Sequence, residues 1–268
     1  MLSAQRTTPV TLAGQDTLVG FWQALSRLSP DARIVRAPAI TAAVFPACAP
    51  LNNAILTRPA PGDPDTVSAA ANLFADAEIQ GWALWVPSHA TGLRVADTLD
   101  ELPGLIRDTT TLVMTTTLKA SLRTHEGVVR TSITAAALAA GEPIPVGDLP
   151  EGDDHTELSG WVKVSDGAAV AGAWSFRQGT DCGVYAVETL PRWRRRGHAR
   201  ILVEHLLADA YQQGARTATL QSTAMGQRLY SSLGFRPVGR YEEWVPHGVD
   251  RADRADDDED GSFRCVFC

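Results

Sequence analysis

The chain lacks two features of exported and membrane proteins. No apolar run approaches the roughly 20 residues of a membrane-spanning helix, and residues 1–15 lack the apolar stretch of a signal peptide. Cysteine is scarce, because four in 268 residues make no disulfide framework of the kind that small secreted proteins use. These absences predict a cytoplasmic protein that has no membrane partner.

Several familiar catalytic motifs are also missing. The sequence has no GxxxxGK[ST] phosphate loop, no GxGxxG after a strand, no HExxH helix and no GxSxG elbow. Its six histidines share no metal-ligand spacing, so we expect no metal site. The net charge of −7 argues against a nucleic-acid partner, because phosphate neutralisation needs a basic face.

The composition is that of a folded protein with a substantial core. Hydrophobic residues make up 44% and charged residues 21% of the chain, which leaves little reason to expect overall disorder. A length of 268 residues suits one large domain or two of about 130 residues.

The second half shows the clearer pattern of secondary structure. Alternating residues predict a β-hairpin over 160–176 and a third strand over 182–190, which ends at Pro191. An amphipathic helix follows, ended by Gly214. The remaining predicted elements are a strand over 217–221, a helix over 224–233 and a strand over 235–245. This order predicts an α/β fold with a mixed sheet.

The first half gives a weaker signal of similar kind. Predicted helices cover 12–28, the segment that starts at Asp63-Pro64 and stops at Gly81, and 91–102; predicted strands cover 40–45, 54–57, 82–86 and 109–118. We therefore divide the chain into a first domain over 1–139, a linker rich in Pro, Gly and acidic residues over 140–157, a second domain over 158–246 and an acidic, flexible tail over 247–268. The tail ends in Cys265-x-x-Cys268, a weak metal signal when alone.

The most informative segment joins the strand over 182–190 to the helix that follows. Its sequence Arg194-x-x-Gly197-x-Ala199 forms a glycine-containing loop at a helix start. The first N–H groups of a helix have no partner within it, and they lie at the positive end of the helix dipole. Such a loop is suited to bind a pyrophosphate, and the neighbouring arginines add positive charge.

At these residues the chain resembles the GCN5-related N-acetyltransferases. RRRGHA matches the [QR]-x-x-G-x-[GA] family motif, and Tyr230-Ser-Ser-Leu-Gly-Phe235 matches a second family segment after the fifth strand. The resemblance covers about residues 158–245 and implies the acetyltransferase fold there. The segments at Pro50 and Trp82 resemble a bacterial subset that has a degenerate acetyltransferase-like half before the active one.

The resemblance also implies a mechanism. Acetyl-CoA would lie between two splayed parallel strands, and a small-molecule amine would attack its thioester carbonyl directly, with Tyr230 as the general acid. The acceptor could instead be a protein N-terminus or a lysine, and a non-catalytic CoA-binding module is a further alternative. We expect a monomer or a homodimer. The residues implied in CoA binding are Val187, Thr189, Arg194, Arg195, Arg196, Gly197, His198, Ala199, Arg200 and Ser222.

The general base is not identified by this resemblance. The family's usual strand-four glutamate falls on Gly183 here. Glu188 lies on the same predicted strand, but an odd separation from Gly183 predicts that its side chain faces the opposite side. Asp181, Glu242 and Glu243 remain as candidates. We also expect the family's first two helices to be shortened between Ile133 and Ser159, and the first half to help wall the acceptor site.

Overall fold

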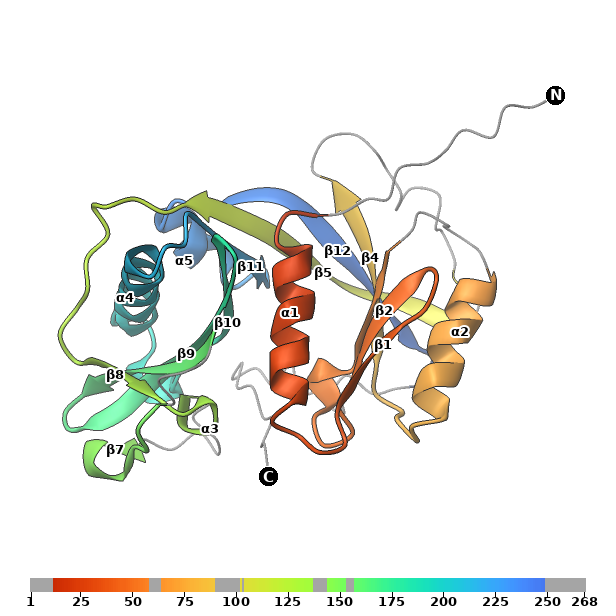
Figure 1. Ribbon diagram of the computed structural model, residues 1–268, viewed down its shortest axis with the longest axis horizontal. Helices are drawn as coiled ribbons and strands as arrows, with labels where there is room; N and C mark the ends of the chain where they lie inside the picture. Colours follow the sequence, from red (N-terminus) through yellow and green to blue (C-terminus); the bar gives the residue numbers. More distant parts are fainter. Residues whose placement is uncertain are drawn as a thin grey trace.

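A computed structural model describes residues 12–57, 64–89, 102, 104–136, 144–152 and 157–248 of the chain. In this part of the chain, twelve strands form one continuous sheet with the main order β1-β2-β3-β4-β12-β5-β11-β10-β9-β8-β6, and β7 pairs with β9 (Figure 1). The strands are β1 (Arg33–Arg36), β2 (Ile40–Val44), β3 (Asn53–Leu56), β4 (Ala83–His89), β5 (Leu105–Thr117), β6 (Val128–Thr131), β7 (Ile144–Pro145), β8 (Leu158–Ser165), β9 (Ala168–Gln178), β10 (Asp181–Thr189), β11 (Thr217–Ser222) and β12 (Arg236–Pro246).

The helices start and stop at residues whose conformation explains the boundary. The α-helices are α1 (Gln15–Ser26), α2 (Pro64–Ala75), α3 (Ile133–Ala136), α4 (His198–Gln212) and α5 (Gln227–Ser232). Helix α4 follows Gly197, which has φ 85°, and stops before Gly214, which has φ 100°. Both angles lie in the left-handed region that glycine adopts readily. The 3₁₀ helices are η1 (Ala49–Leu51), η4 (Val146–Asp148) and η5 (Pro191–Trp193).

The two halves of the sheet exchange strands. Each half contains one parallel pair connected by a helix, β3 with β4 in the first half and β10 with β11 in the second. One long strand of each half then pairs with the other half: β5 is antiparallel to β11, and β12 is antiparallel to β4. Strands β5 and β12 also pair with each other at the centre. The sheet is therefore continuous across both halves.

Helices α1 and α4 lie on opposite faces of the β9–β10 region (Figure 1). Phe21 of α1 packs in one core cluster with Trp174, Phe176 and Tyr185, and its ring stacks on that of Tyr185 with centroids 3.8 Å apart. Leu202 and Leu206 of α4 pack in a second cluster, and a third lies under α2 in the first half. A helix from the first half thus covers the sheet of the second.

Most of the predicted elements are present with shifted ends. The mixed α/β class and the elements of the second half are confirmed. Strands β1 and β6 were not predicted, and α2 ends at Ala75, earlier than the stop predicted at Gly81. Residues 91–101 of the helix predicted over 91–102, the linker residues 140–143 and 153–156, and the tail beyond residue 248 with its two cysteines lie outside the described residues. Because the halves share one sheet, the division at 139 and 158 remains a prediction.

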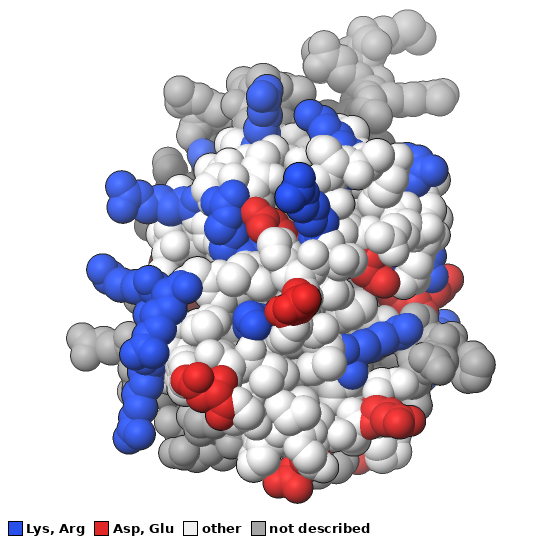
Figure 2. Space-filling model, turned by 90° about the vertical axis from the view of Figure 1, so that its left-hand side faces the viewer, with Lys and Arg blue, Asp and Glu red and all other residues white. Residues whose placement is uncertain are grey.

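The two cysteines of the described residues differ in state. Cys182 is a buried free thiol, whereas Cys48 is disulfide-bonded. The cytoplasm is a reducing compartment in which disulfides are rare, so the predicted cytoplasmic location does not account for this bond. The location stays a prediction. No helix in the described ranges is long and apolar enough to cross a membrane. Figure 2 shows that on one face of the molecule the Lys and Arg side chains are interrupted by acidic and uncharged surface.

Candidate active site

The loop between β10 and α4 has an open backbone cradle. Arg195 has φ 60° and Gly197 has φ 85°, so two residues of the loop adopt left-handed conformations. The first backbone hydrogen bond of the helix runs from the Ile201 N–H to the Gly197 carbonyl at 3.1 Å. The N–H groups of the three residues before Ile201 therefore have no acceptor within the helix. A Cβ built on Gly197 would meet nothing within 4 Å. Successive free N–H groups in such a loop form a site for an anion.

The side chains of this loop support its shape. Arg196 stacks its guanidinium over the Trp193 ring at 5.2 Å, and Arg194 donates from Nε to the Thr189 carbonyl at 3.0 Å. His198 lies edge-on to Trp193 and is half-buried, with both ring nitrogens out of contact with water. Burial, followed by the charges of Lys163 and Arg196, lowers the pKa of His198. The imidazole is therefore neutral at pH 7 and adds no charge to the site.

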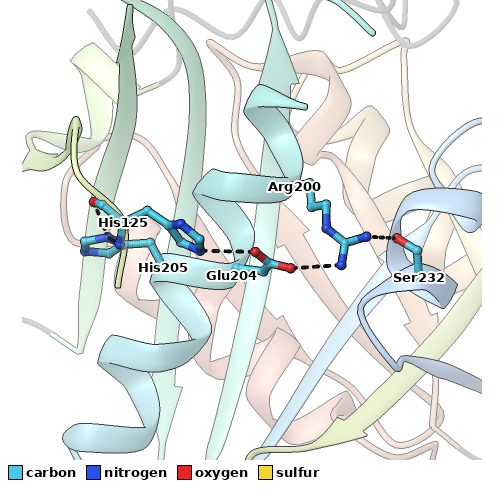
Figure 3. Close-up of polar contacts among 5 residues, drawn as sticks. All are labelled: His125, Arg200, Glu204, His205 and Ser232. Carbon is cyan, nitrogen blue, oxygen red and sulfur yellow. Dashed lines mark hydrogen bonds and ion pairs between the residues drawn. The ribbon is translucent and has the colours of Figure 1, made fainter. Parts of the chain in front are cut away.

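Arg200 is held by neighbouring side chains. Its Nη2 lies 3.0 Å from Oε1 of Glu204, and its Nη1 donates to the Ser232 hydroxyl at 3.0 Å. Glu204 also pairs with His125 at 3.1 Å, and the His125 N–H donates to Nδ1 of His205 at 2.8 Å. Figure 3 shows this row of contacts running across α4 to α5. The Arg200 guanidinium is thus engaged away from the loop, although its backbone N–H belongs to the cradle.

Strands β10 and β11 separate beside the loop. Their parallel pairing ends at Gly183 and Thr219, so among the described residues the rest of β10 has no partner strand on that side. On the other side, the register with β9 shifts between Tyr185 and Glu188, where Ala186 has φ 48°. This β-bulge leaves Val187 outside the ladder, and the Thr189 hydroxyl oxygen is buried with no partner among the described residues. Both predicted pantetheine-binding residues therefore lie at the separated edge.

Tyr230, Ser222 and Gly226 lie together near the end of β11. Tyr230 is 9% exposed and packs edge-on against Phe235, with ring centroids 5.9 Å apart. Burial raises the pKa of its phenol above the usual value, so the hydroxyl is protonated at pH 7. A Cβ built on Gly226 would lie 2.8 Å from the Tyr230 ring and 3.1 Å from Oγ of Ser222. The Ser222 hydroxyl donates to the Thr223 carbonyl at 2.8 Å.

The side chain of Glu188 lies on the same face of β10 as Gly183, the face that the sequence analysis did not predict for it. Gly183, Tyr185 and Glu188 pair with Phe176, Trp174 and Gly172, which alternate along β9 and therefore share one face. Between the last two of these pairs, two residues of β10 (Ala186 and Val187) lie opposite one residue of β9 (Ala173). The extra residue reverses the parity, so Glu188 lies on the same face as Gly183 and the prediction of the opposite face was wrong. Burial raises the pKa of Glu188 to about 7, although the nearby Arg194 lowers it.

The other three candidate carboxylates have partners. Asp181 accepts hydrogen bonds from the hydroxyls of Thr17, Thr217 and Thr219, each at 2.7 Å. Glu242 forms ion pairs with Arg240 at 2.6 Å and with Arg107 at 3.5 Å. Glu243 accepts a hydrogen bond from the Thr111 hydroxyl. These contacts bind elements of the sheet and α1 together, which is a structural role.

The expected shortening of the family's first two helices between 133 and 159 stays a prediction, because residues 137–143 and 153–156 lie outside the described residues. The described residues of that segment contain only the four-residue helix α3 and the 3₁₀ turn η4 as helical structure. The face of β9 and β10 is instead covered by α1, whose Thr17 binds Asp181 and whose Gly20 lies against Gln178 and Phe176. The first half therefore covers this face of the sheet, and its role in walling the acceptor site stays a prediction.

Comparison with known proteins agrees with this geometry. Residues 133–235 match the model of the acetyltransferase (GNAT) family. A GCN5-related N-acetyltransferase from Kribbella flavida superimposes with a TM-score of 0.64 at 20% identity, covering 90% of this chain and 99% of that one. A GCN5-related N-acetyltransferase from Sphaerobacter thermophilus gives 0.52 at 19%, covering 88% and 87%. At these identities the structures show a shared fold. No curated protein matches the chain.

The separated strands, the open loop and the following helix belong to the fold that this chain shares with these acetyltransferase structures. More specifically, the chain carries a GNAT acetyltransferase domain, whose family model spans the site just described. Proteins of this family use acetyl-CoA, and their acceptors are small molecules or proteins. In the described part of the chain, no three His, Cys, Asp or Glu side chains cluster as metal ligands would.

Proposed function

We propose that this protein transfers an acetyl group from acetyl-CoA to the amine of a small molecule. The observation that carries the proposal is the open cradle at Gly197, which lies beside the unpaired edge of β10. A pyrophosphate would bind the N–H groups of Arg195, Arg196, Gly197, His198, Ala199 and Arg200. The pantetheine arm would pair with Val187 and Thr189 like an added strand, with Ser222 on the opposite side.

The chemistry is a direct displacement at the thioester. The amine nitrogen forms a bond to the carbonyl carbon, the C–S bond breaks, and the leaving thiolate takes a proton from the Tyr230 hydroxyl. Burial raises the pKa of that phenol, and the same desolvation raises the pKa of a thiol beside it. Tyr230 therefore keeps its proton before the reaction. When the C–S bond breaks, the CoA thiolate accepts that proton.

A small acceptor is favoured by the wall that α1 provides. Phe21 stacks on Tyr185, and Thr17 is hydrogen-bonded to Asp181, so the α1 face of β10 is covered along its first half. A protein segment needs an open groove along the sheet, and this covered face offers less room for one. The acceptor would therefore approach at the end of β10 near the bulge.

Calorimetry and a thiol-release assay test the proposal. We expect the protein to bind acetyl-CoA, the variant Gly197→Glu to lose binding, and a panel of small amines to include one that releases CoA. Tyr230→Phe should lower kcat by about 100-fold, with acetyl-CoA affinity changed by less than about twofold. Absence of acetyl-CoA binding would overturn the proposal. Binding without thiol release for any amine would instead favour a CoA-binding module, and transfer only to peptides a protein acceptor.

A further inference from the structure

We propose that Glu188 is the base that takes the proton from the acceptor amine, a role that rests on the acetyl transfer proposed above. An alkylammonium group must lose a proton before its nitrogen can attack, and at pH 7 only about one in 2,500 molecules of an amine with pKa near 10.4 is neutral. A site that supplies a base at the acetyl group assists this deprotonation.

The position of Glu188 is set by the β-bulge. The extra residue turns its side chain onto the α1 face, next to Val187 and Thr189 at the unpaired edge where the thioester arm would lie. Its cross-strand neighbour is Gly172, which presents no side chain to it. Glu188 is an odd number of residues from Gly183, the family's usual position for the base. The bulge nevertheless places both residues on the same face of β10.

The usual position cannot hold an acid in this chain. A Cβ built on Gly183 would collide with the hydroxyl and ring of Tyr185, which folds over the glycine. The Tyr185 hydroxyl is itself buried without a partner in the described part of the chain, and burial raises its pKa well above the usual value. Tyr185 therefore stays protonated at pH 7 and is no base.

Glu188 also lacks the partners that a structural carboxylate would have. Its residue is 6% exposed, and within the described residues its carboxylate makes no hydrogen bond or ion pair. Buried carboxylates are costly unless paired, as Asp181, Glu242 and Glu243 are. An ammonium group from an acceptor would supply the missing partner.

The charges around Glu188 leave it able to exchange a proton near neutral pH. Arg194 is the charged side chain that lowers the pKa of Glu188, while Asp181 raises the pKa of Tyr185 on the same face of β10. Asp16 of α1 acts on Tyr241. Burial outweighs Arg194 and raises the pKa of Glu188 to about 7, which is the range in which a general base works best.

The protons balance through two residues. Glu188 accepts one proton from the ammonium group, and the neutral nitrogen attacks the carbonyl carbon. Collapse of the tetrahedral intermediate breaks the C–S bond, Tyr230 protonates the thiolate, and the amide nitrogen loses its second proton to water. Glu188 then releases its proton and Tyr230 regains one from solvent. The net reaction is alkylammonium plus acetyl-CoA to amide, free CoA and one proton.

The test compares Glu188→Gln with the wild type, using the amine that the wild-type enzyme turns over fastest in the panel. At pH 7 we expect kcat to fall by about 100-fold, with acetyl-CoA affinity unchanged by calorimetry. The ratio of wild-type to variant rate should then decrease about tenfold for each unit of pH above 7, because the amine deprotonates unaided. Glu188→Asp should retain part of the activity, and the exposed Glu157→Gln should behave as wild type.

Three results would overturn the inference: a variant kcat within about threefold of wild type, a rate ratio that is constant with pH, or full loss in Glu188→Asp with normal acetyl-CoA binding. A wild-type protein that turns over no amine would instead refute the proposed function itself. If Glu188→Gln does not fold, Glu188→Asp carries the test, because its shorter carboxylate should move the acidic limb of the kcat profile.

Discussion

The guanidinium of Arg200 donates to the hydroxyl of Ser232 at 3.0 Å and so joins the first turn of α4 to the last turn of α5. Ser232 in turn donates to the Leu229 carbonyl at 2.6 Å, within the short helix that carries Tyr230. The segment that would bind the pyrophosphate and the segment that would protonate the thiolate are therefore connected by one side-chain contact (Figure 3).

This contact predicts different roles for two arginines of the same motif. Arg196→Ala should weaken acetyl-CoA binding about fivefold, or ~1 kcal/mol, because its exposed guanidinium keeps its N–H donors while it stacks on Trp193 and can therefore meet a phosphate. Arg200→Ala should weaken binding by less than about twofold, because Glu204 and Ser232 hold its guanidinium. Ser232→Ala breaks the same contact, so we expect it to lower kcat by the same factor as Arg200→Ala. Calorimetry and steady-state kinetics would show the reverse order if Arg200 bound phosphate directly.

Gly197 should be needed for acetyl-CoA binding, in addition to its contribution to the stability of the fold. Gly197→Ala places a side chain at φ 85° and should lower the free energy of unfolding by about 1–2 kcal/mol. Gly214→Ala is the matched control, since Gly214 has φ 100° at the other end of α4 and also faces open space. Urea unfolding should show similar losses for both variants. Only Gly197→Ala should lose acetyl-CoA affinity, and an equal loss in both would contradict the assignment.

Gly226 should act through Tyr230. Gly226→Ala would place a methyl group 2.8 Å from the Tyr230 ring, so the ring must shift. We expect kcat to fall about tenfold, since misplacement of a catalytic group by a fraction of an ångström is costly. Gly147→Ala, which has no atom within 4 Å, is the control. A normal kcat for Gly226→Ala would show that the position of Tyr230 is not critical.

Glu188 predicts a pH dependence of stability that is independent of catalysis. Its pKa is about 7 in the folded protein against an ordinary value of 4.5, so between these values the folded state holds a proton that the unfolded state has lost. The contribution of Glu188 to the free energy of unfolding therefore decreases as pH rises from 4.5 to 7. Relative to wild type, Glu188→Gln should be more stable by about 2 kcal/mol at pH 8 and equal at pH 4. A stability difference that does not change with pH would contradict this.

Asp181 should stabilise the contact between the halves. Its carboxylate accepts hydrogen bonds from Thr17 of α1 and from two threonines of β11. Asp181→Asn should lower the free energy of unfolding by about 2 kcal/mol, because an amide cannot accept all three hydroxyls. Thr17→Val should cost about 1 kcal/mol. Equal unfolding midpoints for wild type and Asp181→Asn would show that the contact contributes nothing.

Local patterns predict most of the second half well. Alternation over 160–176, the proline at 191 and the apolar stripe from Leu202 to Ala210 each reflect residues that interact with near neighbours in the chain. The loop at Gly197 is predictable for the same reason, since a glycine at a helix start has a local cause. Strands β1 and β6 are less predictable, because they are short strands at the edges of the sheet.

The features that decide the candidate base are not local. Ala186 adopts φ 48° without being glycine, so nothing in the residue type announces a bulge, and a parity argument therefore assigns Glu188 to the wrong face. The pairing of β5 with β11 joins residues about 100 positions apart, and no periodicity within either segment encodes that choice of partner. The family motif locates the site, but the side chains that surround it depend on these distant pairings.

The exchange of β5 and β12 has a consequence for how the chain is made. During synthesis, β5 leaves the ribosome long before its two neighbours, β11 and β12, and until they are made neither of its edges has a strand to satisfy its amide and carbonyl groups. Strand β4 waits longer still, for β12. The nascent first half is therefore open to unwanted association while translation continues, and completion of the polypeptide is what closes both edges.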